Sequence, residues 1–92
     1  MKKARKTKKI KVLGQDVTLS HIDGLKNEEA LRCWGLCLVQ ERMIFLDASL
    51  TGAAYNRVLR HEVFHMKAGI SGLTELLSEG IEEALAVLAE TD

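Results

Sequence analysis

Residues His61-Glu62-Val63-Phe64-His65 place two histidines four positions apart, with a glutamate directly after the first. In an α-helix, residues so spaced lie about 40° apart around the axis and one turn apart along it, so both imidazoles can reach one metal ion. Glu62 projects from the same turn, where a carboxylate can take a proton from a metal-bound water. The motif therefore predicts a helix that carries a zinc site, with His61 and His65 as ligands and Glu62 as general base.

The residues around this motif favour a buried helix. The sequence predicts that it runs from about Ala53 to Lys67, with Ser49 or Thr51 as its cap and Gly69 as the residue that ends it. Apolar side chains cover much of its circumference, and an unpaired polar group in such a helix is costly. We therefore expect the two histidines and the glutamate to form a site rather than a solvated face.

Apolar and β-branched runs predict a small sheet ahead of this helix. We expect a strand over residues 10–19, interrupted by a turn at 14–16, and a hairpin formed by residues 36–39 and 43–46. A helical turn capped by Asn27 is expected over residues 27–31. The predicted fold class is α+β, with a small, mainly antiparallel sheet of about three strands packed on the motif helix and on a C-terminal helix.

The C-terminal helix is predicted from Ile81 to Glu90, after a short turn or helix over residues 73–78. The periodicity of its apolar residues predicts a core face. That face holds Ile81, Ala84, Leu85 and Leu88.

A catalytic zinc ion needs a third protein ligand and one open coordination position. No histidine follows His65, so we expect this third ligand to be a carboxylate from the C-terminal segment. The candidates are Glu75, Glu79, Glu82, Glu83 and Glu90.

A formal net charge of zero hides an uneven distribution of charge. Seven of the thirteen basic residues lie within residues 2–11, so residues 12–92 carry a net charge of −7. We expect residues 1–9 to form a disordered basic arm and residues 10–92 to form a single metallopeptidase domain. A solvated tail is the simplest role for this arm. Contact with nucleic acid is the weaker alternative, because no aromatic residue interleaves with its lysines.

The composition bounds the core and the cellular location. The chain is 47% hydrophobic but only 4% aromatic, so an aliphatic core is expected. No apolar run is long enough to span a membrane, and the N-terminus lacks the apolar stretch of a secretory signal. We therefore expect a cytoplasmic protein without membrane contact, in which Cys33 and Cys37 are reduced structural thiols.

The order of these elements resembles a known family. An apolar strand ends in Ile44-Phe45-Leu46-Asp47, the motif follows in Val58-Leu59-Arg60-His61-Glu62-Val63-Phe64-His65, and an acidic helix closes the chain. Over about residues 35–90 this resembles the small bacterial and phage metallopeptidases of the ImmA/IrrE kind, which are minimal gluzincins. The resemblance implies a zinc-bound endopeptidase fold, with a glutamate of the last helix as third ligand.

Among the candidate glutamates, resemblance favours Glu83. Glu83-Ala84-Leu85 resembles the thermolysin-type helix, in which the ligand glutamate is followed by alanine and an apolar residue. Glu79 is the alternative, because Glu79-Gly80 resembles the ligand segment of other gluzincins. Glu82 also stays open, since periodicity does not separate it from its neighbour.

The predicted function is that of a zinc-dependent endopeptidase, which uses a zinc-bound water and Glu62 as general base. Its partner is a peptide or protein substrate, held extended along a strand edge near Met43–Leu46. The alternative is a non-catalytic or latent zinc-binding regulatory module that contacts nucleic acid or a protein through the basic N-terminus. Glu62 favours the enzyme, because a structural zinc site does not need it. Self-association is a further expectation, since so small a zincin has little room for a cleft.

Overall fold

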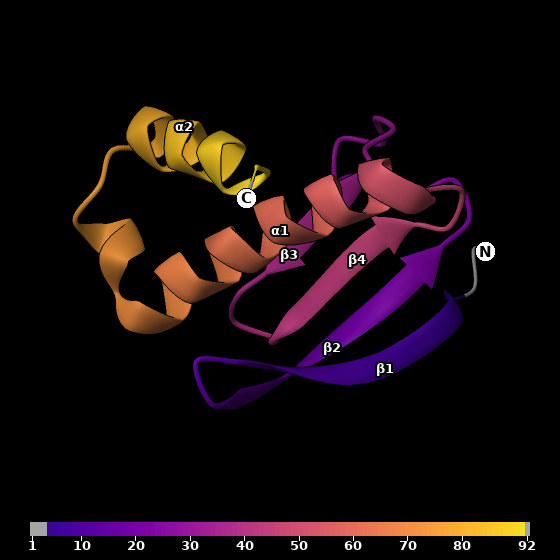
Figure 1. Cartoon of the computed structure of the whole chain (residues 1–92), viewed down its shortest axis with the longest axis horizontal. Helices are drawn as coiled ribbons and strands as arrows, with labels where there is room; N and C mark the ends of the chain where they lie inside the picture. The colour runs from indigo at the N-terminus through magenta and orange to yellow at the C-terminus, as the bar shows by residue number, and fades with distance from the viewer. Residues whose placement is uncertain (1–3, 92) are drawn as a thin grey trace.

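The computed structural model of the chain describes residues 4–91. Over these residues it contains a sheet, two helices and one short 3-10 turn (Figure 1). The strands are β1 (Ala4–Val12), β2 (Gln15–Ile22), β3 (Gly35–Leu38) and β4 (Met43–Asp47). The helices are α1 (Gly52–Ser71) and α2 (Glu79–Ala89), with the 3-10 turn η1 (Leu73–Glu75) between them.

The sheet is mixed, with strand order β1-β2-β4-β3. β1 and β2 form one antiparallel hairpin, β3 and β4 form another, and β2 runs parallel to β4. The expected α+β class is therefore confirmed, and two of the three strand pairings are antiparallel as expected, but the sheet has four strands instead of about three and contains one parallel pair. Residues 23–42, which include β3, connect β2 to β4 and are long enough for the crossover that a parallel pair requires.

The expected disordered arm is wrong for residues 4–9, which belong to β1 and pair with β2. A two-residue turn at Leu13 and Gly14 sets the register of this hairpin. Both residues have positive φ, 50° and 77°, as a type I′ turn requires. Backbone pairing and the burial of Val12 outweigh the repulsion between the lysines, while Lys11 forms an ion pair with Asp16 at 2.7 Å. Residues 1–3 of the predicted arm lie outside the described residues.

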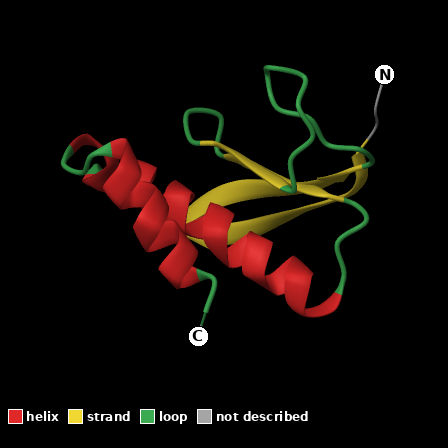
Figure 2. Ribbon diagram, turned by 90° about the horizontal axis from the view of Figure 1, so that it is seen from above, coloured by secondary structure: helices red, strands yellow, loops and turns green. Residues whose placement is uncertain are grey.

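Helix α1 covers one face of the sheet and forms the core with it (Figure 2). The buried cluster is aliphatic, as the composition predicts. Its members are Val12, Val17, Leu19, Ile44, Leu46 and Met66. No helix within residues 4–91 has the length and apolar character needed to cross a membrane.

The end of α1 differs from the prediction. Gly69 lies inside the helix, and Gly72, with φ of 84°, is the left-handed residue that ends it. Gly69 is required for another reason: a Cβ there would meet Cγ1 of Val39 at 2.5 Å. The chain that leaves β3 therefore contacts the backbone of α1 directly.

The predicted helical turn at residues 27–31 is also wrong. The side-chain oxygen of Asn27 accepts hydrogen bonds from the amides of Glu29 (2.9 Å) and Leu31 (3.1 Å), which closes a tight turn instead of starting a helix. A buried carboxylate, that of Asp47, holds this connection to the sheet by accepting from the amide of Leu25 at 3.0 Å.

Helix α2 begins at Glu79, capped by Ser78, whose hydroxyl accepts from the amide of Ile81 at 3.2 Å. It lies beside α1, on the side away from β1 and β2 (Figure 1). Its predicted core face is wrong, because Ile81 is 53% and Leu88 67% exposed, whereas Ala86 is buried. The helix packs against α1 and not against the sheet, so only a narrow strip of it is covered.

Candidate metal centre

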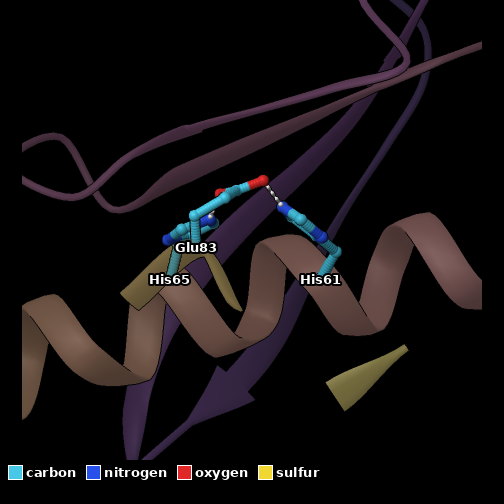
Figure 3. Close-up of side chains that lie close together, drawn as sticks. All are labelled: His61, His65 and Glu83. Atoms are coloured by element: carbon cyan, nitrogen blue, oxygen red, sulfur yellow. Dashed lines mark hydrogen bonds and ion pairs between the residues drawn. The ribbon is translucent and has the colours of Figure 1, made fainter. Parts of the chain in front are cut away.

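Three predicted ligands converge between the two helices. His61 and His65 project from neighbouring turns of α1, and Glu83 reaches across from α2 (Figure 3). Oε2 of Glu83 lies 3.3 Å from Nε2 of His61, and its Oε1 lies 3.0 Å from Nε2 of His65. One ligand atom from each residue lies within 4.8 Å of the other two. The structure thus brings together the three residues that the sequence named.

This donor set fits a zinc ion. The carboxylate of Glu83 bridges the two histidines, with one oxygen 3.3 Å from His61 and the other 3.0 Å from His65, so small side-chain shifts bring one oxygen and both nitrogens to bonding distance of one ion. Two imidazole nitrogens and one carboxylate oxygen form a known ligand set of catalytic zinc, which leaves a fourth position open. The other candidates do not join this group: Glu79 lines the space beside it, and Glu82 contacts the opposite nitrogen of His65.

Each imidazole also contacts a second carboxylate through its Nδ1 atom. Nδ1 of His61 lies 2.7 Å from Oε2 of Glu90, and Nδ1 of His65 lies 2.6 Å from Oε2 of Glu82. Burial alone would lower the pKa of His65, but the hydrogen bonds to Glu82 and Glu83 and the charge of Glu62 raise it. Every ring nitrogen of the two histidines therefore faces a carboxylate of α2 or of its C-terminal cap.

Glu62 lies between the helix and the sheet and is only 8% exposed. Burial raises the pKa of its carboxyl group, the two imidazoles oppose this, and the charges of Glu83 and Glu90 add to it. Room for its side chain comes from Gly35 at the start of β3, where a Cβ would meet Oε2 of Glu62 at 2.7 Å. The carboxylate is thus held among apolar neighbours beside the histidines.

A cleft of about 760 Å³ opens over these residues. One wall is formed by β3 and the residues that follow it, and the other by α1, η1 and the first turns of α2. Within residues 4–91, no lysine or arginine lines it. Five of its lining residues carry a carboxylate: Glu62, Glu75, Glu79, Glu82 and Glu83. The cleft is therefore strongly acidic.

The strand that borders the cleft is β3, the last strand of the described sheet. The expected substrate edge at Met43–Leu46 is wrong, because β4 pairs with β2 on one side and with β3 on the other. The backbone edge available to an extended ligand at this cleft is that of β3. The basic strand β1 lies at the opposite side of the sheet.

Comparison of the chain with protein-family models, with curated proteins and with solved structures finds no match. The case for a metal centre consequently rests on the geometry and chemistry of the site.

Two features of the site were not predicted from the sequence. The close approach of Gly35 to Glu62 has no sequence signal, since it depends on how β3 docks on α1. The contact between Glu90 and His61 does have a sequence signal. Glu83 and Glu90 are seven residues apart, about two helical turns, so a helix that aims the first at the histidines aims the second along the same side.

The remaining residues with reactive side chains lie outside the metal group. Cys37 lines the cleft, but burial and the charges of Glu62 and Glu82 raise the pKa of its thiol to about 12, so it is protonated at neutral pH. Tyr55 accepts or donates a 2.7 Å hydrogen bond with Nε2 of His21 on β2. Tyr55 thus contacts the sheet and is no oxyanion donor for the cleft.

Proposed function

We propose that this protein is a zinc-dependent metallopeptidase that hydrolyses peptide bonds. One observation carries the proposal: Nε2 of His61 and Nε2 of His65 lie 3.3 and 3.0 Å from the carboxylate of Glu83, with the buried Glu62 beside them. A structural zinc site is closed by four protein ligands, whereas three ligands, an open position and an adjacent carboxylate suit hydrolysis.

The residues of the chain divide the chemistry between them. A zinc ion, when bound, supplies a Lewis acid that polarises a carbonyl group and lowers the pKa of water towards about 7. Glu62 accepts the proton of the attacking water at its carboxylate and later donates it to the leaving amine. Burial raises the pKa of Glu62, which favours the protonated form that donates to the leaving amine.

The substrate is proposed to bind as an extended segment along β3. The strand is short, half-buried and at the side of the sheet that faces the metal residues. Backbone pairing with such an edge gives affinity without sequence preference, and it places alternate side chains of the peptide in the cleft. This arrangement supports an endopeptidase, since a strand-like substrate extends beyond the site in both directions.

A peptide library tests the proposal. The zinc-loaded protein is expected to cleave internal bonds of unstructured peptides, detected by mass spectrometry. Glu62→Gln is expected to keep the zinc and lose activity by about 10²-fold or more, because the proton acceptor is gone. Glu41→Gln, an exposed position in the turn between β3 and β4, is the matched control and is expected to cleave normally.

Two results would contradict the proposal. One is full activity in Glu62→Gln. The other is a zinc-loaded wild type that cleaves no member of the library. The second result would favour the alternative, a non-catalytic or latent zinc-binding regulator acting through its basic N-terminal strand, on which Lys8, Lys9 and Lys11 are exposed.

A further inference from the structure

The donor can be identified in the hydrogen bonds on the Nδ1 side of the two histidines. A carboxylate only accepts hydrogen bonds, so Nδ1 is the donor both in the 2.7 Å contact of His61 with Glu90 and in the 2.6 Å contact of His65 with Glu82. By the same rule Nε2 of His65 donates to Oε1 of Glu83 at 3.0 Å in this structure. A metal ion binds an imidazole nitrogen that carries no proton, so a ring that keeps its proton on Nδ1 offers Nε2 as the ligand atom. Both Nε2 atoms face Glu83, on the side where the three ligand atoms converge.

We propose that Glu82 and Glu90, the outer carboxylates, are positioning residues that hold His65 and His61 in the tautomer and orientation needed to bind metal through Nε2. This inference rests on the proposed metal site and adds to it the residues that prepare the ligands. Glu82, an alternative for the third ligand on sequence grounds, is thereby assigned to the outer position and Glu83 to the inner one.

Exposure supports this division of roles. The side chains of Glu82 and Glu90 are 12% and 26% exposed, whereas that of Glu83 is 57% exposed. The residue that must meet an ion and a substrate opens to the cleft, and the two that only orient imidazoles are largely covered. A charged hydrogen bond that is shielded from water is stronger than an exposed one, so it can fix the ring orientation.

The carboxylate of Glu82 and the backbone of Glu90 are themselves held in place. The side chain of Thr74, just after α1, forms a hydrogen bond with Glu82. At the other end of α2, Arg60 donates from Nε and Nη2 to the backbone oxygen of Glu90 at 3.1 and 3.0 Å. One helix therefore supplies the third ligand near its start and an anchored partner for each histidine, near its first turn and at its C-terminal cap.

Zinc affinity measured by chelator competition tests the assignment without any need for catalysis. Glu82→Ala and Glu90→Ala are each expected to raise the Kd for zinc by about 10- to 100-fold. Glu79→Ala is the matched control, since it removes a charge from the same helix and cleft but contacts neither imidazole. Its effect is expected to be clearly smaller.

The conservative variants guard against misfolding. In Glu82→Gln and Glu90→Gln the amide oxygen can still accept from Nδ1–H, so these proteins are expected to lose less affinity than the alanine variants. Long-range ¹⁵N–¹H NMR of the zinc-loaded protein reports the tautomer directly. Both histidines of the wild type are expected to be protonated at Nδ1, and each alanine variant is expected to perturb only its own partner histidine.

Different outcomes separate this inference from the proposed function. Protonation at Nε2 in the zinc-loaded wild type, or equal affinity losses in Glu79→Ala and both outer variants, would overturn the positioning role while leaving peptidase activity possible. A wild type that binds zinc but cleaves no peptide would overturn the proposed function alone. Failure of the wild type to bind zinc would overturn both.

Discussion

Gly35 of β3 and Glu62 of α1 approach so closely that a Cβ on Gly35 would lie 2.7 Å from Oε2 of Glu62 and 2.8 Å from its Cγ. Real Cβ atoms are not found at such distances, so any larger residue at position 35 must move the carboxylate or separate the strand from the helix. The approach also places the proposed substrate strand, β3, directly against the proposed base, Glu62.

Gly35→Ala is expected to bind zinc normally but to lose peptidase activity by about 10²-fold, because a carboxylate displaced by about 1 Å is poorly placed for proton transfer. Zinc content and kcat, measured on the same preparation, check this. Gly80→Ala is the control: a Cβ there meets nothing within 4 Å, and alanine favours the helix. Equal activity in the two variants would show that the contact does not position Glu62.

Metal removal is expected to loosen α2. Among the residues of this helix only Ala86 is buried, so the contacts of Glu82, Glu83 and Glu90 with the histidines contribute much of its docking. Free zinc at about 100 times its Kd stabilises the bound protein by about 2.7 kcal/mol. Amides of α2 that exchange only when the helix opens and releases the metal should therefore exchange about 100-fold more slowly. Hydrogen exchange with and without a chelator measures the effect.

The slower exchange should be seen in α2 and not in the strands that form the core. Amides of Leu19 and Ile44, both fully buried in the sheet, serve as the internal reference. Identical α2 exchange in the two conditions would mean that its docking does not depend on the metal.

Asp47 is expected to make stability depend on pH in the acid range. Burial opposes ionisation, but hydrogen bonds from Ser49 and Leu25 and the charge of Arg32 outweigh it and lower the pKa. Because the pKa of Asp47 is lower in the folded than in the unfolded chain, its ionised form stabilises the fold above the unfolded pKa of about 3.9. This stability is lost as the pH falls through the pKa of the folded state. Urea unfolding between pH 6 and pH 2 measures this dependence.

Asp47→Asn is expected to lower the free energy of unfolding at pH 7 by about 1–3 kcal/mol. The substitution replaces one hydrogen-bond-accepting carboxylate oxygen with an NH₂ group that faces buried donors. The variant is also expected to have a flatter pH dependence. Asp16→Asn, at an exposed ion pair with Lys11, is the comparison and should change stability much less than Asp47→Asn does. Unchanged stability in Asp47→Asn would contradict the anchoring role.

The acidic cleft is expected to prefer cationic substrates. Among the described residues, five carboxylates and two histidines line it, with no lysine or arginine, so one dication bound by neutral imidazoles leaves it negatively charged. A peptide with lysine beside the cleaved bond is expected to be processed about tenfold or more faster than one with glutamate there, and the ratio should fall as salt is added. Competition between the two peptides in one reaction measures the ratio.

The double variant Glu75→Gln and Glu79→Gln removes two charges from the cleft wall and is expected to reduce this preference. Glu28→Gln with Glu29→Gln removes the same charge from an exposed loop and is expected to leave it unchanged. Equal rates for lysine and glutamate peptides in the wild type would refute the electrostatic argument.

The local parts of the site could be predicted from the sequence. Helical spacing fixes His61 and His65 on one side of α1, and the absence of a later histidine limits the third ligand to a carboxylate. The structure brings Glu83 to both histidines, as the sequence reading favoured. The hairpin of β3 and β4 and the aliphatic core were also predicted.

What failed depended on tertiary contacts. The lysines of β1 suggested disorder, yet pairing with β2 and the burial of Val12 order the strand. The apolar residues of α2 suggested a core face, yet Ile81 and Leu88 point to solvent because the glutamates orient the helix towards α1. The strand at the sheet edge beside the cleft is β3 and not β4. Strand order depends on how the chain crosses over after β2, which no local sequence pattern specifies.

Zinc stoichiometry is the most direct test of the central claim. The protein is purified without added metal and dialysed against trace zinc. Its zinc content per chain is then measured by inductively coupled plasma mass spectrometry. The wild type is expected to hold about one zinc ion per chain, and His65→Ala and Glu83→Ala are expected to hold far less. Absence of zinc from the wild type, or its full retention in His65→Ala, would contradict the account.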